Sequence, residues 1–154
     1  MRLDTLTYKY RYKAPKDMMY KTLIETQLQY FRAHDKKIKQ LREGEKITTN
    51  LQTKLQKLDS KTTMEISKII PEKVFQLVTQ QPDNHNITQT FEFKTNESGK
   101  EELVYSEKTQ LNNARSYSFF FLTAILYKYF YNRGMKKKMQ YLDNLALGKV
   151  KIND

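Results

Sequence analysis

The stretch of sequence that most restricts the possible folds is residues 115–147, which we predict to form one long α-helix near the C-terminus. Its first half, residues 116–131, is the most apolar and aromatic part of the chain, and a helix that is apolar on every side must be covered nearly all round. Its second half has an apolar stripe at spacings of three and four, formed by Met135, Met139, Leu142 and Ala146. Lys136, Lys137 and Asp143 are expected to point away from this stripe. The rest of the chain should therefore form a concave surface that holds the helix.

Alternating apolar and polar residues predict the strands of that surface, because successive side chains of a strand point to opposite faces. The alternation predicts strands at about residues 6–12, 45–58, 62–70, 87–94 and 101–109, and a further strand that is apolar on both faces is expected at 73–79. In the third of these strands, one face is expected to carry Met64, Ile66 and Ile70. Turn-forming residues predict a turn at Leu58–Lys61, a break at Pro71 and a hairpin turn at Asn96–Gly99.

Two helices are predicted between the first and second strands. Pro15 favours the start of a helix over residues 16–34, and a second short helix is expected at residues 35–43, with Gly44 as its C-terminal cap. The fold class is then α+β, a helix-grip fold in which a curved antiparallel sheet of about six strands wraps around the long C-terminal helix, with two short helices after the first strand. We expect residues 1–154 to form a single domain.

This order of elements resembles the helix-grip architecture of the START-like superfamily, also called the Bet v 1-like or polyketide cyclase-like fold. The segment Ala14–Met19 is similar to the passage from first strand to first helix in that superfamily. The chain resembles more closely a family of uncharacterised bacterial proteins, through the aromatic and then basic, Met-containing run Leu126–Met139, although Gly134 interrupts this helix. The resemblance covers Arg2 to about Leu147. Members are often encoded beside phosphotransferase sugar-uptake genes and have no established activity, so no functional residue is carried over.

Few residues have the pattern of a reactive centre, and we predict a protein that is not an enzyme, without a metal or cofactor. Cys is absent, which excludes thiolate chemistry, and His34 and His85 are interpreted as structural. We see neither a Gly-rich phosphate loop nor a Ser, His and Asp arrangement. Acidic residues on predicted strands are expected mostly on solvated faces, and an acid/base pair among them is the weaker alternative; they are Glu65, Glu92, Glu101, Glu102 and Glu107.

The net charge of +11 gives two basic clusters. One is expected on the short helix, at Lys36, Lys37, Lys39 and Arg42, and the other on the long helix, at Arg133, Lys136, Lys137 and Lys138. We interpret both mainly as a solvated surface. The second cluster is also a candidate anionic-surface site, for peripheral contact with a membrane or docking of a partner protein. Nucleic acid is the less favoured partner, because the chain has few Arg residues for bidentate base contacts.

The space between the predicted sheet and helix is either filled by side chains or left open as a ligand cavity. Seven residues are expected to face it: Tyr8, Tyr10, Phe91, Phe93, Tyr105, Phe121 and Ile125. Our leading hypothesis is that the protein binds a small hydrophobic ligand there, and the alternative is an interaction or regulatory protein. A cytoplasmic location is expected, because the N-terminus has no signal-peptide pattern and the apolar runs are shorter than a membrane span of about 20 residues. The sequence leaves the ligand and the oligomeric state open.

Overall fold

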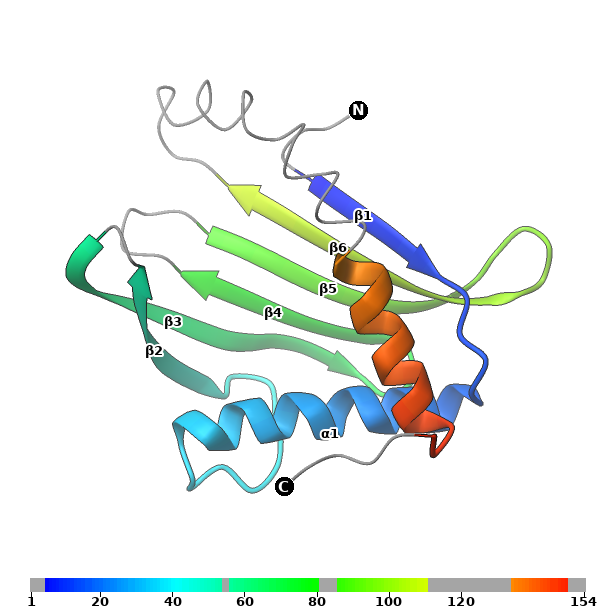
Figure 1. Ribbon diagram of the computed structural model, residues 1–154, viewed down its shortest axis with the longest axis horizontal. Helices are drawn as coiled ribbons and strands as arrows, with labels where there is room; N and C mark the ends of the chain where they lie inside the picture. Colours follow the sequence, from blue (N-terminus) through cyan, green and yellow to red (C-terminus); the bar gives the residue numbers. More distant parts are fainter. Residues whose placement is uncertain (1–4, 54–55, 81–85, 111–133, 150–154) are drawn as a thin grey trace.

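The computed structural model describes residues 5–53, 56–80, 86–110 and 134–149. Its central feature is a curved six-stranded antiparallel sheet with the strand order β1-β6-β5-β4-β3-β2 (Figure 1). The strands are β1 (Thr5–Tyr10), β2 (Lys46–Thr53), β3 (Gln56–Ile70), β4 (Val74–Gln80), β5 (Asn86–Thr95) and β6 (Glu101–Gln110). Helix α1 (Lys16–His34) follows β1, and a C-terminal helix over residues 134–146 crosses in front of the sheet. The predicted α+β helix-grip fold is confirmed; residues 115–133 of the predicted long helix lie outside the described residues.

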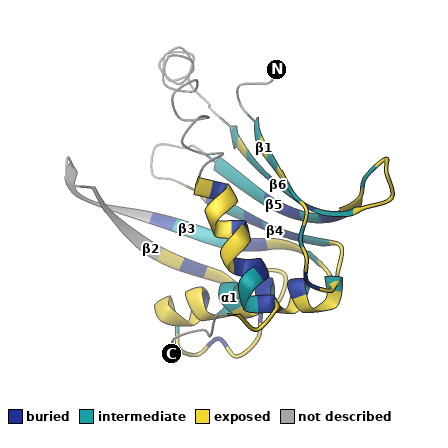
Figure 2. Ribbon diagram, turned by 45° about the vertical axis from the view of Figure 1, so that its right-hand side comes forward, coloured by how far each residue is buried: buried dark blue, intermediate teal, exposed yellow. Residues whose placement is uncertain are grey.

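The core lies on the face of the sheet that the C-terminal helix crosses. Antiparallel register places Tyr8, Tyr105, Phe91 and Phe75 in one row across β1, β6, β5 and β4. Directly opposed residues share a face, so these aromatic side chains meet. The ring centroids of Phe91 and Tyr105 are 4.8 Å apart, and those of Phe75 and Phe91 are 6.2 Å apart. Figure 2 shows the buried residues gathered on the central strands and along one side of the C-terminal helix.

Helix α1 forms where the sequence predicts it and closes one side of this core. Pro15 precedes its first turn, and Met19, Leu23 and Phe31 are fully buried. Tyr20, Ile24 and Leu28 pack against the same core. The helix ends at His34, where the backbone N–H of Asp35 donates to the carbonyl of Phe31 at 2.9 Å. Basic residues in the last turn, Arg32 and His34, suit the negative end of the helix dipole.

The prediction of a second short helix at residues 35–43 is wrong, because this segment is a loop with turns. Asp35 accepts a hydrogen bond from the backbone N–H of Lys37, a local bond that competes with helix formation. At the other end, the N–H of Gly44 donates to the carbonyl of Ile66 on β3 rather than capping a helix. Ile38 and Leu41 are nevertheless buried, so the loop is fixed by packing of its apolar residues.

Strand β3 departs from the predicted pattern in two places. Residues 58–61 lie within the strand instead of forming a turn, because β2 pairs with β3 up to Thr53 opposite Gln56. The register with β4 also shifts between Ile66 and Lys68, which is the mark of a β-bulge. One extra residue reverses the facing of the side chains that follow, so Ile69 packs against the core and Ile70 is exposed, contrary to the predicted face.

The turns at the other end of the sheet follow their sequences. Pro71 begins the β3–β4 turn, in which Glu72 takes a left-handed φ of 59°. The predicted Asn96–Gly99 turn joins β5 and β6 as a hairpin, and the side chain of Asn96 accepts the backbone N–H groups of Ser98 and Lys100 at 3.0 and 2.9 Å. The β5–β6 turn therefore depends on Asn96 and on Gly99, whose φ of 78° suits glycine, whereas Glu72 is a residue type that rarely takes a positive φ.

Asp143 fixes the C-terminal helix to the junction between β1 and α1. Its buried carboxylate accepts hydrogen bonds from the hydroxyl of Tyr10 and from the backbone N–H groups of Lys13 and Ala14, each at 2.9 Å. The prediction that Asp143 points away from the apolar stripe is therefore wrong. Met135, Met139, Leu142 and Ala146 are buried as predicted. The described residues include no helix of the length and apolarity that a membrane span requires.

Candidate functional site

A cavity of about 210 Å³ lies between α1, the sheet and the C-terminal helix. It is the space that a helix-grip fold creates where the helices do not press fully onto the sheet. Its described lining comes from all three parts of the fold and consists of Gln27, Tyr30, Met64, Leu77, Gln89, Phe91 and Lys138. Each strand residue in this lining follows from the alternation of its strand, which directs every second side chain toward the helices.

The apolar wall of the cavity is built by three neighbouring strands. Met64 comes from β3, Leu77 from β4 and Phe91 from β5. Phe91 and Leu77 are almost fully buried, and Met64 packs against the core. Within this wall, the ring of Phe91 contacts the rings of Phe75 and Tyr105. The wall is therefore part of the protein core, and its side chains are held in place by packing.

Gln89 and Lys138 line the polar part of the cavity, and Tyr105 and Glu107 are linked to Gln89 by hydrogen bonds; we call these four residues the polar end. Register places Gln89 on β5 directly opposite Glu107 on β6, so both side chains lie on the inner face of the sheet. The amide nitrogen of Gln89 donates to the hydroxyl of the buried Tyr105 at 2.8 Å, and this hydroxyl donates to Oε2 of Glu107 at 3.1 Å. A chain of hydrogen bonds thus joins the cavity lining to a carboxylate.

The two charged groups of the polar end influence each other. Burial raises the pKa of Glu107 above its ordinary value, while the hydrogen bond from Tyr105 and the positive charge of Lys138 act in the opposite direction. Burial lowers the pKa of Lys138, and the negative charge of Glu107 opposes this shift. Lys138 is among the exposed residues of its helix, yet its side chain lines the cavity, so protein surrounds part of this long side chain.

The predicted cavity residues divide into three groups. Phe91 lines the cavity, and Tyr105 and Tyr8 lie in the same row of the sheet. Phe93 instead contacts the rings of Tyr12 and Tyr20 near the start of α1, with centroids 5.9 and 6.0 Å away. Tyr10 points to Asp143. The remaining two predicted residues, Phe121 and Ile125, lie outside the described residues.

Most of the polar lining was not predicted. Glu107 was expected on a solvated face, but it is half-buried on the inner face. The signal was present, because Glu107 continues the alternation of Leu103 and Tyr105. Gln89 likewise continues the alternation of Phe91 and Phe93. A polar residue at an inward position of an apolar strand face is therefore the sequence pattern that marks this site.

The basic clusters are partly described. Lys136 and Lys137 are exposed, as an anionic-surface site requires, whereas Lys138 belongs to the cavity; Arg133 lies outside the described residues. The predicted cluster on the short helix lies on the loop that replaces it, where Lys36, Lys37, Lys39 and Arg42 are all exposed.

His34, the histidine that the structure describes, does not mark a reactive centre. His34 sits at the end of α1 with its Nδ1 3.0 Å from the carbonyl oxygen of Tyr30, and His85 lies outside the described residues. Within the described ranges, acidic and histidine side chains form no group that could hold a metal ion.

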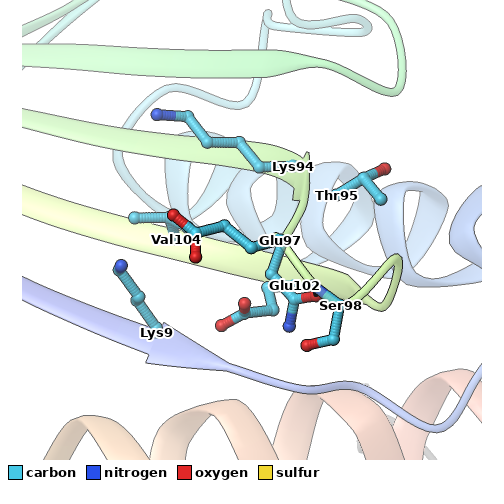
Figure 3. A pocket seen from close by; sticks show the side chains of 8 residues that line it. Lys9, Lys94, Thr95, Glu97, Ser98, Glu102 and Val104 are labelled. Carbon is cyan, nitrogen blue, oxygen red and sulfur yellow. Dashed lines mark hydrogen bonds between the residues drawn. The ribbon is translucent and has the colours of Figure 1, made fainter.

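A second hollow, of about 520 Å³, lies beside the β5–β6 turn on the opposite face of the sheet (Figure 3). Lys9, Lys94, Glu97 and Glu102 surround it, and the Nζ of Lys94 lies 3.3 Å from a carboxylate oxygen of Glu92. It is larger than the inner cavity, but solvated polar side chains dominate its lining. The inner cavity is the better candidate, because its lining combines apolar walls with a small number of polar groups.

Comparison with known proteins agrees with this architecture. The family model DUF3284, described as a domain of unknown function, matches residues 7–131. No curated protein matches the chain.

Among solved structures, a protein of unknown function from Staphylococcus aureus is similar, with a TM-score of 0.61 and 12% identity over 94% of this chain and 95% of that one. Ara h 8.0201 is similar with a TM-score of 0.54 and 8% identity, covering 94% and 97% of the two chains. DynU16, from the dynemicin biosynthetic locus, is similar with a TM-score of 0.58 and 8% identity over 91% of this chain; the chain spans about half of its length, 47%. These likenesses show a Bet v 1-like, START-like fold.

Proposed function

The chain belongs to the DUF3284 family, a domain of unknown function, and we propose that it is a non-enzymatic protein that binds a small, largely apolar ligand in its inner cavity. The observation that carries the proposal is the lining of this cavity. Three apolar side chains from adjacent strands form one wall, and the side-chain amides of Gln27 and Gln89 and the ammonium of Lys138 supply the polar groups of the lining. Small-molecule sites have this composition, in which an apolar surface provides affinity and a few polar groups fix the orientation.

The volume of the cavity limits the size of the ligand. At about 30 Å³ for each water molecule in the liquid, 210 Å³ corresponds to roughly seven waters. Drug-sized ligands generally occupy sites of about 300–1,000 Å³. The proposed ligand is therefore closer in size to a substituted single aromatic ring than to a sterol or a long fatty acid.

A substitution that places a larger side chain of the sheet in the cavity tests the proposal. Toluene binding to the folded protein is followed by NMR titration, together with a Met64→Trp variant that places a larger side chain in the apolar wall. The wild type should bind toluene, and Met64→Trp should weaken binding by about tenfold or more, because the added ring occupies the ligand volume. Glu65→Trp is the matched control, since the next residue of β3 points to the opposite face.

Two results would count against ligand binding. A folded wild-type protein that binds no toluene would mean that side chains fill the space. Equal toluene affinity in the wild type and Met64→Trp, with both proteins folded by circular dichroism, would place the binding elsewhere.

A further inference from the structure

The polar end of the inner cavity has one negative and one positive group. Glu107 carries the negative charge and Lys138 the positive one, and Gln89 and Tyr105 are neutral. Each of the two charges acts on the pKa of the other, although no direct ion pair joins them. The polar end therefore offers a ligand no net charge, while it offers both hydrogen-bond donors and acceptors.

Part of this hydrogen-bonding capacity is still available to a ligand. Gln89 uses its amide nitrogen toward Tyr105, and its amide oxygen makes no hydrogen bond with the described residues. The side-chain amide of Gln27, on the α1 side of the cavity, also makes no hydrogen bond with the described residues. The ammonium of Lys138 has three donor hydrogens. A hydroxyl group can donate to an amide oxygen and accept from an ammonium at the same time, so it matches both kinds of group.

On the basis of the proposed function, we propose that the cavity selects neutral ligands that carry a hydroxyl group on an apolar body and rejects carboxylates of the same size. The apolar body contacts Met64, Leu77 and Phe91, and the hydroxyl reaches the polar end.

Two physical effects discriminate against a carboxylate. The attraction of Lys138 for an anion is already offset by Glu107, so a bound carboxylate would gain little net Coulomb energy. It would also lose its hydration in a partly buried site beside a like charge, and moving an ionised group out of water costs much more than moving a hydroxyl. Burial also raises the pKa of Glu107, which agrees with a site that disfavours negative charge.

The experiment compares three probes with the same ring and methyl group: toluene, 4-methylphenol and 4-methylbenzoate, titrated by NMR at neutral pH. Wild-type protein should bind 4-methylphenol more tightly than toluene, and 4-methylbenzoate about tenfold or more weakly than 4-methylphenol. Glu107→Gln removes the negative charge with little change in shape. This variant should bind 4-methylbenzoate several-fold more tightly than the wild type does and change 4-methylphenol affinity much less.

Glu102→Gln is the matched control, because Glu102 lies on the same strand but on the opposite face, and it should leave all three affinities unchanged. Wild-type binding of 4-methylbenzoate as tight as that of 4-methylphenol would overturn the inference and leave the proposed function standing. Unchanged 4-methylbenzoate affinity in folded Glu107→Gln would also overturn it. If none of the three probes binds, the proposed function itself fails. The ranking in the wild type tests the inference even where the variant does not fold.

Discussion

The side chain of Asp143 joins the C-terminal helix to the β1–α1 junction, which is distant in sequence. Three donors from the β1–α1 junction converge on its carboxylate, and the residue is almost fully buried. Burial first, and then the hydrogen bond and negative charge of Asp143, raise the pKa of Tyr10 well above its ordinary value. Tyr10 therefore stays protonated and can act as a donor throughout the neutral range.

Removing this carboxylate should destabilise the fold. Asp143→Ala leaves the N–H groups of Lys13 and Ala14 without their acceptor, so we expect a loss of about 2–4 kcal/mol in the free energy of unfolding, measured by urea titration. Gln140→Ala, at an exposed position of the same helix, should change it by less than about 0.5 kcal/mol. Equal effects of the two substitutions would mean that the carboxylate does not hold the helix in place.

Glu107 gives a pH dependence whose sign can be worked out. Burial raises its pKa from the ordinary value of 4.5, so the folded protein holds this proton more tightly than the unfolded chain does. Its contribution to stability is therefore fully present below pH 4.5 and is lost as the pH rises through the folded pKa. We expect the free energy of unfolding of the wild type, minus that of Glu107→Gln, to fall between acidic and neutral pH. A difference that rises with pH would show that Tyr105 and Lys138 outweigh burial.

At the scale of the elements, the bulge in β3 decides which of two adjacent isoleucines belongs to the core. Ile69 lies opposite Phe75 and packs against the core, whereas Ile70 is 37% exposed. Ile69→Ala should therefore cost about 1–3 kcal/mol and Ile70→Ala less than about 1 kcal/mol, by urea titration. The predicted alternation of the sequence gives the reverse order. A larger loss for Ile70→Ala would mean that the register does not shift at Ile66–Lys68.

At the scale of the whole molecule, the net charge of +11 affects association with any anionic surface. Lys136 and Lys137 are exposed, so Lys136→Gln/Lys137→Gln should change the free energy of unfolding by less than about 0.5 kcal/mol. We expect binding of the wild type to anionic vesicles at low salt that is lost near an ionic strength of about 0.15 M, because salt screens separated exposed charges.

The double variant also separates diffuse attraction from a specific surface. Vesicle binding that persists at physiological salt and requires Lys136 and Lys137 would favour the anionic-surface hypothesis. Vesicle binding that falls with salt in the same way for the wild type and the double variant would indicate that only the overall positive charge attracts the protein to the vesicles.

The local elements of this fold could be predicted from the sequence, because their signals are short-range. The residue patterns identify β1, β4, β5 and β6 within two residues at each end, whereas the predicted boundary between β2 and β3 is five to six residues off. The spacing of Leu23, Leu28 and Phe31 identifies the face of α1. The Asn96–Gly99 turn has its own side-chain hydrogen bonds. The same local reasoning fails at residues 35–43. The backbone N–H of Gly44, directly after this segment, donates to the carbonyl of Ile66 on β3 and does not cap a helix.

Only the tertiary structure decided how the candidate site is assembled. Gln89 and Glu107 face each other because β5 and β6 pair in one register, and Lys138 joins them from a helix that lies far away in sequence. Asp143 and Tyr10 are similarly distant, 133 residues apart. Side-chain periodicity tells which face of an element a residue occupies, but it contains no information on which other element covers that face. Which element covers which face is set by packing of the whole sheet against its helices. This packing brings polar residues that face inward together at one end of the cavity.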